Sequence, residues 1–440
     1  MFGKYLVLLI TSLLMMACSE ERTINDSVIL PEDSELCQYP YERNSALWDY
    51  LNDWYLWNED LESSIDLFAY ESPQALMEEV KQNTPLDRWS NITDSKKQDD
   101  FFSRGEILSF GFEALLDESK SELIIAQVYD DSDAFTIGLQ RGDRLLSINN
   151  KLIIDAVNDG SLESGEIWGQ DATGTAAELK WKTPTNEVLT GHVKKRSVKI
   201  NTVLHSSVIS IGHSNVGYFV FSNFLGPSAQ ELEQVFEYFT QQNVDQLIID
   251  LRYNGGGSSN IANQLASQIA GENVRDKVFA KYFHNANHSD KNVSEDFNLY
   301  GANPALNLGK VTFLTTDNTA SASELLINAL KPHIGVQLVG TDTHGKPSGF
   351  KAAQLCDQTV FAVNVTIRNA DDEGDYYDGL PVDCSAADTL AADWGDVRDP
   401  LLAEALFLLE NGVCSNTGQS IDNSQASFKL IRAGQKTQFL

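Results

Sequence analysis

The stretch "TASASELLINAL" at residues 319–330 places small and hydroxyl-bearing residues directly before an aliphatic run. Ser321 and Glu324 fit the capping box, in which each side chain bonds a free backbone N–H at the start of a helix. The same position suits a nucleophile, because the N–H groups at a helix start can face a developing negative charge. A serine hydroxyl needs a base to take its proton, so Ser321 alone leaves both roles open.

Two residues in the later loop "GTDTHGKPSGF" could supply that base. Lys346 lies between Gly345 and Pro347, just after an apolar run that predicts a buried strand. A lysine base must be neutral, so its pKa has to fall by roughly three units from its reference value of about 10.4. Burial beside apolar groups lowers it in this way. His344 is the alternative base, and it would make the protein a Ser/His hydrolase.

The segment "DLRYNGGGSSN" predicts the end of a buried strand, a glycine turn and the start of a helix. Gly255, Gly256 and Gly257 let the backbone approach a ligand closely, and N–H groups at a helix start suit an oxyanion. A phosphate-binding loop would need Gly-Lys-Ser/Thr at this point, which the segment lacks. The turn is therefore either an anion-stabilising loop or a simple turn.

The elements that must position these residues change character along the chain. Residues 37–102 carry a helical pattern, and residues 107–200 alternate as strands do. From about residue 215, strands and helices alternate, which predicts an α/β layered core. The run "TVFAVNVTIRNA" at residues 359–370 predicts one long strand, and the polar residues 415–440 predict a loose tail.

The composition and the first residues of the chain limit the classes of function that the protein can have. The formal net charge of −31 disfavours nucleic-acid binding through phosphate contacts. An apolar run of residues 5–16 that leads to Cys18 predicts a signal peptide with a lipidated cysteine, the alternative being a plain signal peptide. In an exported protein, Cys37, Cys356, Cys384 and Cys414 predict up to two disulfides, with the pairing open. Their spacings fit no zinc pattern, so no metal is expected.

Together these segments resemble the carboxyl-terminal processing proteases, also called tail-specific proteases, a family of Ser/Lys serine peptidases. "GLQRGDRLLSINN" resembles the PDZ domain of the family, and "DLRYNGGG" resembles its Leu-Arg-x-Asn-x-Gly-Gly strand end. "TASASELLINAL" and "HGKPSG" resemble its nucleophile and lysine segments. Lys346 follows Ser321 by 25 positions (346 − 321), which is the family's spacing and one that Ser323 does not fit.

The resemblance implies a role for each residue of the site. Ser321 becomes the nucleophile, Lys346 the general base and Glu324 a further acid of the catalytic set. The N–H groups of Ala322 and Gly257 would form the oxyanion hole, with the choice of glycine open by one position.

The resemblance also implies how a substrate is held. Phe110, Gly111 and Phe112, in "LSFGF", would form the loop that binds a substrate tail, although the segment departs from the family's Gly-Leu-Gly-Phe form. The PDZ domain would present that tail as an added strand.

The expected fold is multidomain α+β, with a helical N-terminal domain, a β-rich PDZ-like domain and an α/β peptidase core of the crotonase/Clp-protease kind. The expected boundaries are residues 1–18 for a lipoprotein signal peptide, 19–36 for a flexible tether, 37–105 for the helical domain, 106–200 for the PDZ-like domain, 201–414 for the peptidase core and 415–440 for the polar tail.

The expected function is exported serine endopeptidase activity on protein or peptide substrates, through an acyl-enzyme and without a cofactor. A lipid on Cys18 would anchor the protein in the bacterial cell envelope, facing the periplasm or the cell surface. The alternative is a catalytically silent, PDZ-bearing lipoprotein that binds peptides.

Overall fold

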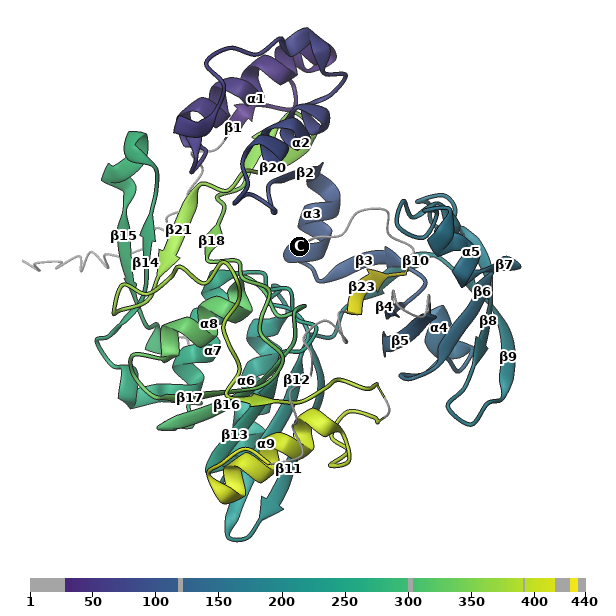
Figure 1. The fold of residues 1–440 in the computed structure, drawn as a ribbon, viewed down its shortest axis with the longest axis vertical. Helices are drawn as coiled ribbons and strands as arrows, with labels where there is room; N and C mark the ends of the chain where they lie inside the picture. The colour runs from purple at the N-terminus through teal and green to yellow at the C-terminus, as the bar shows by residue number, and fades with distance from the viewer. Residues whose placement is uncertain (1–27, 118–121, 300–303, 391, 416–427, 434–440) are drawn as a thin grey trace, which may run out of the picture.

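The computed structural model describes residues 28–117, 122–299, 304–390, 392–415 and 428–433, and shows three packed bodies (Figure 1). In this view the N-terminal helical body lies at the top, the α/β body below it and the β-rich body to the right. The expectation of a lipidated Cys18 falls on a residue outside these ranges. Within them, no helix has the length and hydropathy that a membrane crossing requires.

The α/β body is built on a six-stranded sheet in the order β11-β12-β13-β16-β17-β22. Only the β11–β12 pair is antiparallel, and the pairs from β12 to β22 are parallel. The strands span Val203–Ile211, Ser214–Phe221, Gln246–Asp250, Lys310–Thr315, Gly335–Gly340 and Cys384–Ser385. This parallel core confirms the predicted alternation of strands and helices.

Helices cover both faces of this sheet, as a buried parallel sheet requires. Helices α6 (Ser228–Gln241), α7 (Ser259–Ala270) and α8 (Ala322–Leu330) pack their apolar residues on one face, and α9 (Pro400–Asn411) covers the other (Figure 1). Helix α7 ends at Gly271, as the sequence predicts. The layers leave the C-terminal ends of the parallel strands and the start of α8 at one edge.

The N-terminal body is less independent than expected. It contains α1 (Pro40–Trp54), α2 (Pro73–Asn83) and α3 (Ser95–Phe102). Its sheet has the order β1-β19-β20-β2, from Val28–Leu30, Ala353–Leu355, Gln358–Phe361 and Asn91–Asp94. Because β19 and β20 come from the segment assigned to the peptidase core, the two bodies share a sheet. Strand β1 lies inside the expected tether of residues 19–36, so the tether assignment is wrong from residue 28 onward.

The predicted long strand at residues 359–370 is two strands. Strand β20 belongs to the N-terminal body, whereas β21 (Val365–Arg368) belongs to a separate sheet in the order β15-β14-β21-β18. The other strands of this sheet, β15, β14 and β18, span Val293–Asp296, Val278–Phe283 and Ser348–Gly349. The break falls at residues 362–364, where the chain passes from one body to the other.

The β-rich body is an antiparallel sheet in the order β23-β4-β5-β6-β8-β9, with β7 paired to β6. These strands span Phe428–Arg432, Phe112–Asp117, Glu122–Val128, Arg144–Ile148, Ala176–Lys182, Val188–Lys194 and Lys151–Leu152. Helices α4 (Asp133–Thr136) and α5 (Ile153–Asn158) lie against the sheet, and β3 (Glu106–Ser109) pairs with β10 (Arg196–Lys199). Strand β23 comes from the expected loose tail, so that assignment is wrong for residues 428–432.

Two disulfides settle the pairing that the sequence left open. Cys37 bonds Cys356, and Cys384 bonds Cys414. The first joins the N-terminal segment to the β19–β20 turn, and the second joins β22 to the segment after α9. Both close loops across separate parts of the chain.

Candidate active site

Ser321 stands in the turn between β16 and α8, where it is the residue that precedes the helix. Its backbone has φ 57° and ψ −115°, a conformation that non-glycine residues adopt only under strain. The predicted capping box is present, and the Ser321 N–H donates to Glu324 Oε2 at 2.9 Å. Capping and catalysis therefore do not exclude each other here, because the cap holds the backbone that presents the hydroxyl.

Lys346 lies in the loop after β17 with only 4% of its surface exposed. Its Nζ is 4.3 Å from the centroid of the Phe350 ring. Burial lowers the pKa of Lys346 to about 8, against the opposing charges of Glu324 and Asp87. A lysine with such a pKa is partly neutral near physiological pH and can accept a proton.

Glu324 connects the two candidate catalytic residues through their backbones. This buried carboxylate accepts hydrogen bonds from the N–H groups of Ser321 at 2.9 Å, Lys346 at 2.8 Å and Gly345 at 2.6 Å. The Thr343 hydroxyl donates a fourth at 2.6 Å. Burial raises the pKa of Glu324, and these hydrogen bonds oppose that rise. Glu324 thus positions both residues without itself facing the cavities that they line.

The glycine turn lies directly against the start of α8. A Cβ added to Gly256 would lie 2.8 Å from both the Ala322 nitrogen and Ser321 Cβ. The Gly256 N–H already donates to Asn254 Oδ1 at 2.9 Å. The bridge between Phe224 and Gly257 uses the Gly256 carbonyl and the Ser258 N–H, not the Gly257 N–H.

Two backbone donors near Ser321 therefore remain for an oxyanion. One is the N–H of Gly257, because the bridge to Phe224 does not use it. The other is the N–H of Ala322, which as the first residue of α8 has no intrahelical acceptor.

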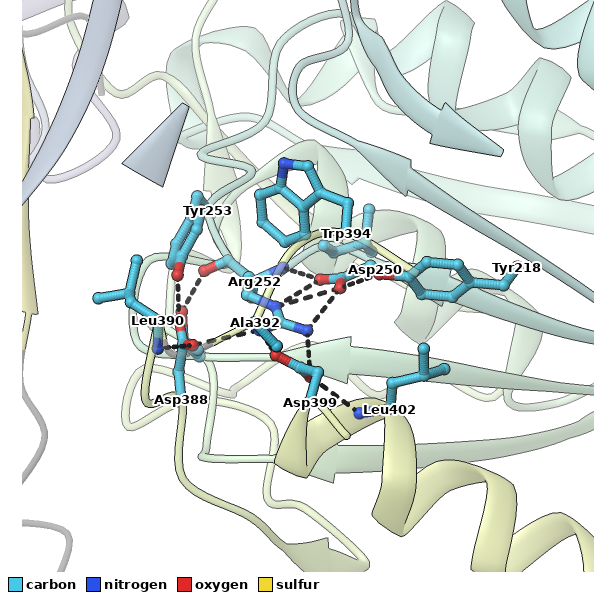
Figure 2. Close-up of polar contacts among 12 residues, drawn as sticks. Tyr218, Asp250, Arg252, Tyr253, Asp388, Leu390, Ala392, Trp394, Asp399 and Leu402 are labelled. Carbon is cyan, nitrogen blue, oxygen red and sulfur yellow. Dashed lines mark hydrogen bonds and ion pairs between the residues drawn. The ribbon is translucent and has the colours of Figure 1, made fainter. Parts of the chain in front are cut away.

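A buried charge cluster fixes the strand end that leads into this turn (Figure 2). The Arg252 guanidinium, 1% exposed, bonds the carboxylates of Asp250, Asp388 and Asp399. Tyr253 donates its hydroxyl to Asp388. Asp388 precedes α9 and Asp399 is the cap residue of α9, so the cluster ties the C-terminal helix to the segment that carries the glycines.

The N-terminal body holds the loop of the candidate base. Arg88 donates to the carbonyls of Gly345 at 3.3 Å and of Tyr377 at 2.9 Å. The Trp89 indole N–H donates to His344 Nε2 at 3.3 Å, and His344 Nδ1 lies 3.3 Å from the Asp317 carbonyl. With both ring nitrogens bonded and its pKa lowered by burial, His344 serves the loop structure and is a poor candidate for the base.

Two cavities meet at Ser321 and Lys346, since both residues line each of them. The other lining residues of the first are Asn91, Phe101, Phe102, Asn223, Gly255, Gly256, Gly257, Phe350, Phe361 and Arg432. The other lining residues of the second are Gly257, Ser259, Tyr282, Ala322, Leu325, Ser348, Gly349, Phe350, Val365, Ile367 and Tyr376. An extended chain could therefore pass through the reacting position on both sides.

The structure does not bring the expected tail-binding loop into these cavities. The Phe110 and Phe112 side chains are fully buried in the core of the β-rich body. The Gly111 N–H donates to Ser109 Oγ at 3.0 Å, and a Cβ at Gly111 would lie 2.0 Å from Ser132 Cβ. Any recognition at this loop therefore uses its backbone and the neighbouring strand β4, not the two aromatic side chains.

Sequence reasoning missed the residues that desolvate the lysine. Phe350 follows it by four positions, and Trp89 comes from the distant N-terminal body, with its ring centroid 6.0 Å from Lys346 Nζ. The aromatic at Phe350 could have been noticed as a local neighbour. Nothing in the sequence around Trp89 indicates that it lies near Lys346, because only the tertiary fold brings the two residues together.

One grouping in the described part of the chain has the proximity of metal ligands, namely Cys384, Glu404 and Cys414. The two sulfurs are joined to each other in a disulfide, so the group offers no thiolate. It lies apart from the two cavities.

A serine at a helix start that shares a cavity with a buried lysine is compatible with the Ser-Lys variant of serine-protease chemistry. Residues 215–379 match "Peptidase family S41", and residues 42–91 match "Peptidase S41 N-terminal domain". Two separate segments of the chain thus match domain models of peptidase family S41.

Relatives with established names agree with this assignment. The carboxy-terminal processing protease CtpB of Bacillus subtilis is 25% identical over 56% of this chain and 48% of its own length. A carboxyl-terminal-processing protease of Picosynechococcus is 26% identical over 59% of each chain. The matches thus span about half of these relatives. The fold is similar to that of a Bacteroides fragilis protein assigned to the S41 proteases, with a TM-score of 0.67, 24% identity, and coverage of 82% of this chain and 96% of that one.

Proposed function

We propose that the protein is an exported serine endopeptidase in which Ser321 and Lys346 act as a catalytic dyad on protein substrates. The observation that carries the proposal is the placement of a buried lysine, with its pKa lowered to about 8, in the same two cavities as a serine at a helix start. The S41 domains support the reaction class.

The geometry suggests the following acyl transfer. Ser321 Oγ attacks the peptide carbonyl carbon, and neutral Lys346 Nζ takes the hydroxyl proton. The N–H groups of Gly257 and Ala322 stabilise the oxyanion of the tetrahedral intermediate. As the C–N bond breaks, Lys346 gives the proton to the leaving amine, and water then hydrolyses the acyl-enzyme.

Export and recognition form the finer part of the proposal. Two disulfides support an oxidising compartment, in keeping with a lipid anchor on Cys18 in the cell envelope. The β-rich body, with a glycine turn at Gly111 followed by strand β4, supports a PDZ-like role in which a substrate tail adds to the sheet.

Cleavage of an unstructured protein such as casein tests the dyad. The chain from residue 19 onward is compared as wild type, Ser321→Ala, Lys346→Ala and His344→Gln. We expect the first two variants to lose cleavage and His344→Gln to keep it in part, because His344 only supports the loop. Equal cleavage by wild type and Ser321→Ala would contradict the proposal, and loss only in His344→Gln would favour a Ser/His pair.

A further inference from the structure

The chain's own C-terminal segment lies on the β-rich body as an added strand. Strand β23 pairs antiparallel with β4, from Phe428 opposite Asp117 to Arg432 opposite Glu113 (Figure 1). Its C-terminal direction leads toward the Gly111 turn. There the Ala433 N–H donates to the Phe112 carbonyl at 3.2 Å, and Ser109 Oγ donates to the Ala433 carbonyl at 2.7 Å. Main-chain pairing of this kind is how an extended peptide adds to an exposed sheet edge.

Side chains on both faces of this segment, residues 428–433, contact the rest of the protein. Ile431 and Ala433 pack into the core of the β-rich body. Leu430 packs in a cluster that also contains Tyr253 of the peptidase segment. Arg432 Nε bonds Glu113 Oε1 at 2.9 Å, and both side chains are about nine-tenths or more buried, at 4% and 6% exposed. The edge of β4 thus offers apolar contacts and one buried carboxylate that selects a basic residue.

The same segment reaches the candidate active site. Asn318, three positions before the nucleophile, donates from Nδ2 to the Phe428 carbonyl at 2.7 Å. Arg432 lines the first cavity together with Ser321 and Lys346. Residues 428–433 therefore contact the loop that leads to Ser321 at one end and the first cavity near the other.

We propose that residues 428–433 are a resident ligand of the β4 edge, with which substrate segments must compete, and that Glu113 gives this edge a preference for an apolar–apolar–basic pattern. The inference rests on the proposed peptidase function for its biological meaning. Removal of β23 would leave β4 as the edge of the sheet, with its backbone groups unpaired and open to another strand. Glu113 would then await a basic partner.

Residues 428–433 compete strongly with a separate peptide because they belong to the same chain as the β4 edge. A resident segment on the same chain acts at an effective concentration that is on the order of millimolar for a short linker. A substrate segment added in trans at low concentration therefore binds weakly while the resident strand is docked. A change that expels the resident strand opens the edge.

The test measures binding of the labelled peptide Phe-Lys-Leu-Ile-Arg-Ala, the sequence of residues 428–433, by fluorescence anisotropy. All proteins are the full chain from residue 19 with Ser321→Ala, so the readout needs no turnover and a failed peptidase proposal does not affect it. Arg432→Glu places two carboxylates together in a buried site and should expel the resident strand. We expect this variant to bind the peptide about 10²-fold tighter than the Ser321→Ala parent.

Matched control variants distinguish release of residues 428–433 from the β4 edge from general damage to the fold. Arg144→Glu makes the same substitution at a partly exposed ion pair with Glu122 on the same sheet, and it should bind the peptide as the parent does. Glu113→Arg with Arg432→Glu restores the opposite charges and should again exclude the peptide. A peptide with glutamate in place of its arginine should bind Glu113→Arg but not Arg432→Glu.

Equal peptide affinity in the parent and in Arg432→Glu would overturn the inference, as would binding that ignores the charge of the peptide. Failure of both single variants to bind would overturn it as well, provided that the double variant melts at the temperature of the parent. Casein cleavage by the chain with Ser321 intact reports separately on the proposed function.

Discussion

The burial of the Lys346 side chain should determine the pH range in which the protein is active. Only the neutral amine can take the Ser321 proton, and burial lowers its pKa to about 8. We expect kcat/KM for a peptide substrate to rise as the pH increases through about 8 and then to level off, because the neutral fraction grows over that range. A rate–pH profile measures this directly. An acid limb near 6.5, the reference pKa of histidine, would instead indicate a histidine base.

Glu324 should affect the same profile in a second way. Its charge favours the protonated form of Lys346, so Glu324→Gln removes that effect and should move the acid limb to lower pH. The amide also replaces an acceptor of four hydrogen bonds with a group that has one acceptor oxygen and an NH2 group with two donors. We therefore expect a fall in kcat of about 10²-fold from misplacement of the two residues.

Thr343→Val is the control for Glu324→Gln. It removes one hydrogen bond to the carboxylate but leaves its charge, so activity should fall less and the acid limb should stay nearer its original position. A Glu324→Gln profile with unchanged pH dependence and full rate would show that the carboxylate positions nothing.

Local patterns predicted several elements well, and the reason is that their signals are short-range. The Ser321 capping box, the end of α7 at Gly271 and the alternation of strands and helices in the α/β core each follow from nearby residues. The 25-residue spacing of Ser321 and Lys346 was recognised through resemblance, not from local physics. Their placement in common cavities is a result of the fold.

Pairings between distant segments could not be predicted in this way. The run at residues 359–370 is continuously strand-like, yet its two halves join different sheets, because the partners of each half decide its path. Strand β23 sits in a polar tail and forms only because β4 offers it a paired edge. Trp89 and Arg88 reach the Lys346 loop through the same kind of long-range packing.

Substitution of Arg252, at the end of strand β13, should lower the free energy of unfolding substantially. Arg252→Leu would remove the buried partner of Asp250, Asp388 and Asp399. Of these three carboxylates, Asp388 would keep a weaker ion pair with Arg141, at 3.9 Å. Breaking a buried ion network from one side costs about 3–5 kcal/mol, so we expect a loss of this size in the free energy of unfolding in urea. Arg398→Ala breaks an ion pair whose arginine side chain is 85% exposed, and it should change the free energy little.

The N-terminal body and the α/β body are joined at the loop of the candidate base. Arg88 and Trp89 bond residues of that loop, and β2 completes a sheet with β20 from the peptidase segment. The Cys37–Cys356 disulfide closes this arrangement across 319 positions of sequence. The Cys384–Cys414 disulfide, with a separation of 30, lies at α9 and away from the cavities.

The two disulfides should therefore differ in what their removal does to the molecule. Cys37→Ser with Cys356→Ser should lower stability by about 2–4 kcal/mol and also lower kcat/KM, because the N-terminal body then holds the Lys346 loop less firmly. Cys384→Ser with Cys414→Ser should lower stability by a similar order while kcat/KM at a temperature where the protein stays folded remains close to wild type. Thermal melts and peptide cleavage at that temperature measure both effects. If both pairs of substitutions reduced kcat/KM equally, or neither did, the N-terminal body would not be positioning the lysine through this linkage.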